Sequence, residues 1–463
     1  MLKALAPADG QTPALPEPRP GPLRDVVRWE RFSAPELSDR YRRLAEWLRR
    51  GELSEEGLAR ARDLIIELAL ITPGRCQDLR CVALGLHELL SRRDSESAGE
   101  LAIELERTEI TLQHVYLLAG ERHPLEQIRS LLSDEEIAHL AGVKIETVRR
   151  WEKEPSPTAR FYVLLPLARA FRWLRRLGMG REQARAWLFE LPHPALAAPP
   201  LAERQVNYRY LDELAFAEAL QAAGVAESAL ARRRSWMPDT AAVGRLERLA
   251  LLLSQKAPEG KELERVCRQV LELVARVEDV HPGRTLFCLG DLLRRRDGKA
   301  SGTLGAELRR ACLAAERRRL PTDRRRCLEL VGSCMGLSAA QIADLVGVKE
   351  ATVSRWQRSR DEKKASPALR HLAHTAHWLA RAGMSREEAS GWLFERDTSL
   401  SPARSPAETF CRFRRLIGTV PERAFQEALA AMGLEGPPVV PVAGGLAPGP
   451  YVRDKIGLAQ RKP

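Results

Sequence analysis

The chain has 463 residues, 44% of them hydrophobic, with a formal net charge of +12 at pH 7 and a pI of about 9.6. No apolar stretch approaches the roughly 20 residues that span a bilayer, and the N-terminus lacks the hydrophobic segment of a signal peptide, so we expect a cytoplasmic protein and no membrane partner. The positive charge favours a nucleic-acid partner.

The two ends of the chain differ from its middle. Residues 1–27 are rich in Pro, Ala and Gly, and residues 436–463 are similar but end in basic residues, so we predict a disordered Pro-rich N-terminus and a disordered basic tail. Between them, apolar residues recur at helical spacing, as at 64–70 and 246–253, and β-branched runs are short. The predicted fold class is all-α.

Residues 133–153 have the spacing of a helix-turn-helix. Gly142 falls in the turn, where a positive φ is easiest for a residue without Cβ. Val148 and Trp151 follow at a helical interval of three and are predicted to pack back onto Ile137 as core anchors. A turn glycine and two apolar anchors at these offsets resemble the repressor-type helix-turn-helix, which implies insertion of the second helix into the DNA major groove.

The same pattern recurs 205 positions later, at residues 338–358, with Gly347 in the turn and Trp356 as the anchor. We therefore predict a tandem duplication that gives two homologous helical lobes. Lobe 1 would comprise a helical region at 28–132 and a helix-turn-helix with C-terminal helices at 133–236; lobe 2 would comprise the corresponding regions 237–337 and 338–435. Further matches pair Trp173 with Trp378, 187–190 with 392–395, 89–94 with 292–297, and 215–220 with 424–429.

The outward residues around each second helix are the candidate DNA-binding residues. Arg149 can pair bidentately with guanine edges, whereas Ser354 at the same position cannot. Lysine, threonine and arginine positions common to both copies suit contacts to phosphates. The predicted residues are Lys144, Ile145, Glu146, Thr147, Arg149, Arg150 and Lys153 in lobe 1, and Lys349, Glu350, Ala351, Thr352, Ser354, Arg355 and Arg358 in lobe 2.

The segment after each motif has a second resemblance. A long amphipathic helix that ends at a Gly-Met pair and is followed by Ala-x-x-Trp-Leu-Phe is similar to antitoxins of the Xre, MbcA and ParS type. Their C-terminal region binds a toxin, so the resemblance implies a protein partner held by the Trp-Leu-Phe helices. The matching residues are Ala184, Trp187 and Leu188 in lobe 1 and Ala389, Trp392, Leu393 and Pro406 in lobe 2.

Other features carry weaker signals. His371, His374 and His377 share a helix face, but their lobe 1 counterparts Pro166, Arg169 and Arg172 are not metal ligands, so we predict no metal and no cofactor. Eight cysteines without a CxxC pair are predicted to be reduced and mostly buried. Arginines at 317–319 and 324–326 are either an extra DNA contact or a solvated loop. No catalytic motif is recognisable, so we do not expect an enzyme.

Two function classes follow from these patterns. The leading one is a sequence-specific double-stranded DNA-binding protein, either a transcriptional regulator or a plasmid or phage maintenance or replication-initiation factor. The alternative is an antitoxin-like protein-interaction module in which DNA binding is secondary. Duplication leaves two assemblies open, a monomer with two pseudo-two-fold lobes and a homodimer.

Overall fold

The computed structural model describes residues 33–51, 53–73, 76–117, 124–153, 163–189, 208–222, 228–359, 363–395, 405–412 and 418–434. Within them the chain is all-helical, as predicted, with one isolated antiparallel bridge between Asp323 and Lys364. None of the helices in these ranges is long and apolar enough to cross a membrane. The predicted disordered segments 1–27 and 436–463 lie outside the described residues.

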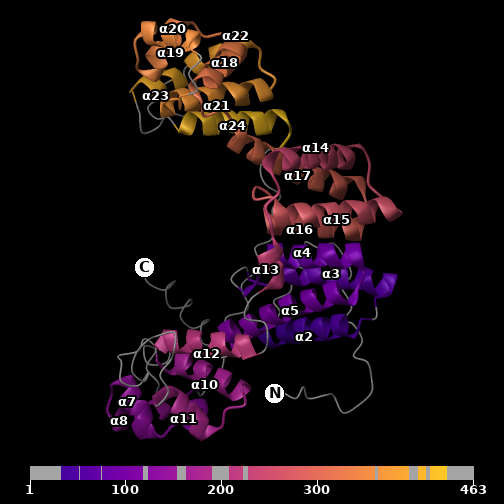
Figure 1. The fold of residues 1–463 in the computed structure, drawn as a ribbon, viewed down its shortest axis with the longest axis vertical. Coiled ribbons are helices and arrows are strands. Elements are labelled where there is room, and N and C mark those ends of the chain that lie inside the picture. The colour runs from indigo at the N-terminus through magenta and orange to yellow at the C-terminus, as the bar shows by residue number, and fades with distance from the viewer. Residues whose placement is uncertain are drawn as a thin grey trace, which may run out of the picture.

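In the described part of the chain, buried side chains form three hydrophobic clusters, which define a central core and two arms. The central core draws residues from 37–112 and again from 230–315, so the predicted regions 28–132 and 237–337 share one core. The first arm is built on residues 110–220 and the second arm on residues 313–434. Figure 1 shows the two arms at opposite ends of the longest axis, with the central core between them.

The central core is a stack of helix pairs. In Figure 1 the pair α2 and α5 lies next to the first arm and the pair α14 and α17 lies next to the second arm. Between them, α3 contacts α16 and α4 contacts α15, across the boundary of the two halves of the chain. The helices are α2 (Ala34–Arg50), α3 (Glu55–Ile71), α4 (Leu79–Arg92), α5 (Ser95–Leu112), α13 (Ala229–Arg233), α14 (Asp239–Gln255), α15 (Gly260–Arg276), α16 (Pro282–Arg295) and α17 (Gly298–Arg319).

Arginine-centred contacts join the halves. The Arg80 guanidinium donates hydrogen bonds of 2.7–2.9 Å to four backbone carbonyls at and beyond the end of α15, namely those of Val274, Val277, Glu278 and Val280. The last carbonyls of a helix have no N–H partner within the helix. The Arg80 guanidinium supplies hydrogen-bond donors at this end of α15. The fully buried Glu67 carboxylate, on α3, lies 2.8 Å from a guanidinium nitrogen of Arg294, on α16. A buried carboxylate needs such a partner, so these contacts fix how the halves meet.

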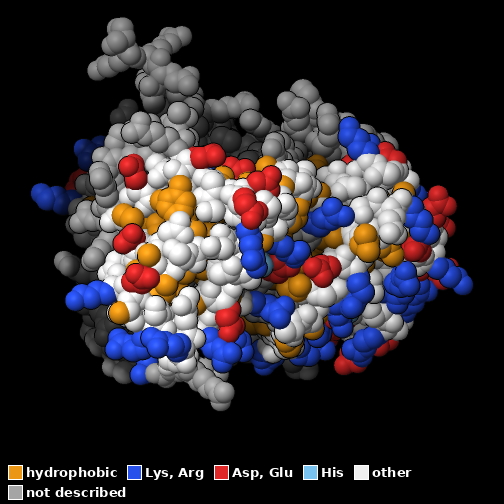
Figure 2. Space-filling view, turned by 90° about the horizontal axis from the view of Figure 1, so that it is seen from above, with side chains coloured by type: hydrophobic (Ala, Val, Ile, Leu, Met, Phe, Trp, Pro, Cys, Tyr) orange, Lys and Arg blue, Asp and Glu red, His pale blue; other side chains and the backbone are white. Residues whose placement is uncertain are grey.

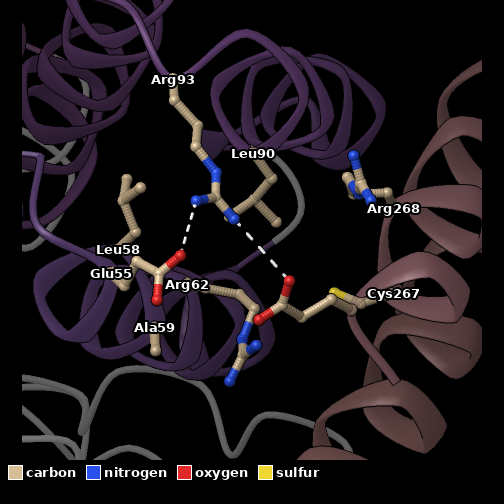
Figure 3. Close-up of a pocket in the computed structure, with 9 residues that line it drawn as sticks. Glu55, Leu58, Ala59, Arg62, Leu90, Arg93, Cys267 and Arg268 are labelled. Atoms are coloured by element: carbon tan, nitrogen blue, oxygen red, sulfur yellow. Dashed lines mark hydrogen bonds and ion pairs between the residues drawn. The ribbon is translucent and has the colours of Figure 1, made fainter. Parts of the chain in front are cut away.

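Figure 3 shows a small cavity at the same junction. Arg93, at the end of α4, reaches Glu55 on α3 at 3.0 Å and Glu264 on α15 at 3.7 Å. The cavity has a volume of about 40 Å³, little more than the space of a water molecule, so it holds no substrate-sized ligand.

Arg93 and Arg296 have positive φ values of 54° and 51°, and each lies directly before an aspartate that caps the next helix.

The arms are smaller helical clusters attached to α5 and α17. In each, a long helix, α10 or α21, packs against a later helix, α12 or α24. The first arm contains the π-helix η2 (Gln113–Leu117), α6 (Pro124–Arg129), α7 (Asp134–Ala141), α8 (Ile145–Lys153), α10 (Leu165–Arg176), α11 (Arg181–Phe189) and α12 (Tyr208–Ala222). The second contains α18 (Arg324–Met335), α19 (Ala339–Val346), α20 (Glu350–Arg358), α21 (Pro367–Arg381), α22 (Arg386–Phe394), α23 (Pro406–Arg412) and α24 (Thr419–Ala431).

Candidate nucleic-acid interface

The first predicted motif lies on α7 and α8. Ser133 caps α7 through a capping box with Glu136, which satisfies two N–H groups at the helix start. Gly142 ends α7 with a φ of 61°, and the Val143 N–H donates to the Ala138 carbonyl at 3.0 Å. This is the bond pattern of a Schellman motif, in which a left-handed glycine lets the chain reverse out of the helix. The predicted positive φ of Gly142 is confirmed.

The second predicted motif has the same turn between α19 and α20. Ser338 and Gln341 form the capping box, and Gly347 ends α19 with a φ of 73°. The Val348 N–H donates to the Ala343 carbonyl at 3.0 Å. A larger side chain would meet no steric obstacle at either turn glycine. The positive φ, and not a lack of space, is therefore the reason for glycine at these two positions.

Each second helix is anchored by a fully buried valine, Val148 in α8 and Val353 in α20. Trp151 is also buried, with 7% of its surface exposed, as predicted. Trp356 differs from the prediction because it is only partly buried and packs against the edge of the second arm's cluster. The Arg324 guanidinium lies over its ring, 4.6 Å from the centroid, which is the geometry of a cation–π contact. In the second arm, therefore, a cation covers the ring that apolar side chains cover in the first.

The predicted DNA-binding residues are mostly on the surface. Ile145 is the clearest departure in the first arm, because it is half-buried and packs against the cluster beneath α8. The exposed members are Lys144, Glu146, Arg149, Arg150 and Lys153 in the first arm and Lys349, Glu350, Ala351, Arg355 and Arg358 in the second; Thr147, Thr352 and Ser354 are half-buried like Ile145. Figure 2 views the molecule from the end that carries the second arm and shows Lys and Arg side chains gathered along one edge of this face.

Arg129, which the sequence did not single out, ties the first motif together. Its guanidinium lies 2.8 Å from Asp134 on α7 and 3.1 Å from Glu152 on α8, and the hydrogen bond to Asp134 raises the pKa of Arg129. Arg149 lies 3.9 Å from the same Asp134 but keeps 63% of its side chain exposed. Arg149 is therefore held loosely enough to reach for a ligand, whereas Arg129 is a structural bridge. Arg129 and Glu152 lie far apart in the sequence, so no local sequence pattern predicted this bridge.

The residues of the predicted protein-binding helices are largely internal. Trp187 and Leu188 on α11 are 3% and 1% exposed, and the Trp187 indole donates to the Glu218 carboxylate at 2.7 Å. On α22, Leu393 is fully buried, whereas Phe394 is 44% exposed. Of the other matched residues, Ala184, Ala389 and Pro406 are buried and Trp392 is partly buried.

The histidines at 371, 374 and 377 lie on α21 and are half-buried. Burial lowers the pKa of His374 to about 4, with a further contribution from His371. The group of potential metal ligands found among the described residues is a different one, Glu247, Cys312 and Glu316. Arg381 already forms ion pairs with both of these carboxylates, so the positive charge there comes from the chain itself.

Most arginines of the cluster that precedes the second motif are engaged within the protein. Arg317 pairs with Glu422 at 2.7 Å, and Arg318 pairs with Glu278 and Asp279. Arg325 pairs with Glu329 on its own helix. This cluster therefore acts largely as an intramolecular tether. None of the eight cysteines forms a disulfide, and six of them are buried.

Comparison with known proteins gives no further guide to the site. No protein-family model, curated protein or solved structure matches the chain. The site therefore consists of the exposed basic faces of α8 and α20, each of which follows a glycine turn.

Proposed function

We propose that the chain is a sequence-specific double-stranded DNA-binding protein that uses two helix-turn-helix units, one in each arm. The observation that carries the proposal is the pair of helices α8 and α20, each of which buries a valine on its inner face and exposes a basic outer face. Such a helix fits the width of the DNA major groove. The protein would act at the nucleoid as a transcriptional regulator, or as a maintenance or replication-initiation factor of a plasmid or phage.

The two helices divide the work between positioning and reading. Lys144 and Lys349 occupy matching positions, as do Arg150 and Arg355, and all four are exposed. Charges common to both units suit phosphates, which are the same at every base pair. Arg149 has no basic counterpart in the second unit, so it is the residue that we expect to contact a guanine edge.

The alternative, capture of a toxin-like protein partner by the Trp-Leu-Phe helices, has less support. Trp187, Leu188 and Leu393 are used inside the arms and are not available to a partner in this conformation. Phe394 alone of the large apolar residues on these helices offers a substantially exposed ring. A single exposed ring is common on protein surfaces and favours no partner.

The test is the salt dependence of binding to duplex DNA. If the four shared cations each contact a phosphate, the plot of log K against log[salt] should be linear with a slope of about −3.6 or steeper, because each phosphate contact contributes roughly −0.9. Binding of the full-length chain to a randomised duplex would be titrated from low to physiological salt. A flat plot, or no binding at low salt, would overturn the proposal.

A matched pair of variants separates this effect from net charge. The variant Lys349→Ala with Arg355→Ala removes two exposed cations, one from the N-cap of α20 and one from α20 itself. The variant Lys261→Ala with Arg265→Ala removes two exposed cations from α15 in the central core. The first variant should make the slope shallower by roughly 1.8. The second should leave the slope nearly unchanged. Equal effects of the two variants would show that only the overall charge of the protein matters.

A further inference from the structure

The contacts inside the central core are reciprocal. Under the predicted duplication, α3 corresponds to α15 and α4 to α16. Across the junction α3 contacts α16 and α4 contacts α15, so each half offers the same two helices and receives the same two in return. Reciprocal contacts of this kind define an isologous, two-fold arrangement; a head-to-tail repeat would place the end of one half on the beginning of the next.

The arms join the core at matching positions. Arg176, on α10, donates to Gln113, directly after α5, at 2.6 Å. Arg381, on α21, donates to Glu316, on α17, at 3.1 Å. The arginines match at the offset of the motifs, and Gln113 and Glu316 match at the offset of the helices α5 and α17. The relation between the halves therefore extends from the core into the arms.

Each arm also contains a Trp–Phe contact at matching sequence positions. Trp173 and Phe216, which join α10 to α12, have ring centroids 5.3 Å apart. Trp378 and Phe425, which join α21 to α24, have ring centroids 4.8 Å apart. Both arms therefore hold their long helix against the later helix in the same way, which supports extending the approximate two-fold relation of the core to α8 and α20.

The thickness of the core sets a lower limit on the distance between α8 and α20. Four layers of helices separate the arms, and packed helices lie about 8–10 Å apart, so the core alone spans roughly 24–30 Å between its outer layers. Each arm adds further layers before its reading helix is reached. Figure 1 shows α8 and α20 at opposite ends of the molecule. One turn of DNA, about 34 Å, is therefore too short, and the next in-phase distance is two turns, about 68–72 Å.

We propose that a single chain binds an inverted repeat whose two half-sites lie two helical turns apart on one duplex. The inference rests on the proposed function and adds to it the orientation and spacing of the target. The two-fold relation requires half-sites related by a dyad and not direct repeats, and the four-layer core requires their wide spacing. The unequal residues Arg149 and Ser354 make the two half-sites different in sequence.

The experiment uses the full-length chain and half-sites selected from randomised duplexes. The two halves are placed in inverted, everted and direct orientation, with centres 10, 15, 21 and 26 base pairs apart, and affinity and stoichiometry are measured for each duplex. We expect one chain per duplex and tightest binding to the inverted repeat at 21 base pairs. Moving the second half-site by half a turn puts it on the opposite face of the duplex and should weaken binding by about 100-fold or more, because the second contact is then lost.

The outcomes separate the inference from the proposed function. Equal or tighter binding to direct or everted repeats, tightest binding at 10 base pairs, or one chain holding two separate duplexes would overturn the inverted two-turn arrangement while leaving DNA binding intact. Binding to no duplex would overturn the proposed function itself. As an internal control, Arg149→Ala should relax base preference in one half-site only, and Ser354→Ala should act more weakly and in the other.

Discussion

Each arm supports a pair of short helices, α7 with α8 in the first and α19 with α20 in the second, and the polar groups behind the two pairs differ. In the first arm, Arg169 on α10 and His114 each lie 2.9 Å from the buried Asp212 carboxylate on α12. At the sequence offsets of the predicted duplication, Arg169 pairs with His374 in the second arm and Asp212 pairs with Pro421 on α24. An ion-pair cluster in one arm thus corresponds to a half-buried histidine in the other.

The difference shows which contacts are needed to pair the helices. Both arms keep the Trp–Phe contact and the turn glycine, although the polar groups around them have changed. Apolar contact and the conformation of the turn are therefore enough to define how the helices of each arm pack. The polar groups behind the short helices differ between the arms, provided that each buried polar group has a partner.

Truncation of the two anchor tryptophans should have unequal effects. Trp151→Ala should lower the free energy of unfolding of the first arm by roughly 3–5 kcal/mol, because a large buried ring leaves a cavity. Trp356→Ala should cost clearly less, because its ring is partly exposed under Arg324. Hydrogen exchange of the two arms, measured in the same samples, would compare them directly. Equal costs would show that cover by a cation stabilises the ring as well as an apolar core does.

Loss of the buried carboxylate should destabilise only the first arm. Asp212→Ala leaves Arg169 and His114 without their acid, and we expect a cost of about 2–3 kcal/mol, below the 3–5 kcal/mol typical of fully buried pairs because Arg169 is 25% exposed. The double variant Asp212→Leu with Arg169→Leu should recover much of this loss. Chemical denaturation of both variants checks the expectation, and an undiminished loss in the double variant would contradict it.

Mild acid should weaken the second arm before the first. The folded-state pKa of His374 is lowered to about 4, so below its ordinary pKa the unfolded chain binds a proton that the folded arm does not. The contribution of the neutral His374 to the stability of the second arm is fully present above the ordinary histidine pKa. It falls as the pH drops from that value towards the folded-state pKa of about 4. His374→Gln should flatten this dependence, whereas His139→Gln, at an exposed histidine of the first arm, should not. Hydrogen exchange at a series of pH values provides the measurement.

Local features of the site were predictable from sequence and its long-range supports were not. Gly142 and Gly347 predicted the turns because few other residues adopt a positive φ easily. The shared central core was missed, although α3 buries apolar residues on nearly every side, which is a signal of a helix covered all round. Arg80 gave no such signal, because its four carbonyl partners lie about 200 residues away and a single sequence does not reveal that pairing.

The reciprocal core also has a consequence for how the chain is made. The faces of α3 and α4 that receive α15 and α16 are complete some 200 residues before their partners exist. At about 5–20 residues per second, a ribosome needs roughly 10–40 s to supply the missing half. During that interval a nascent first half exposes an apolar face that fits the same helices of any neighbouring nascent chain. A domain-swapped pair of chains would make the same contacts between these helices as the single folded chain does.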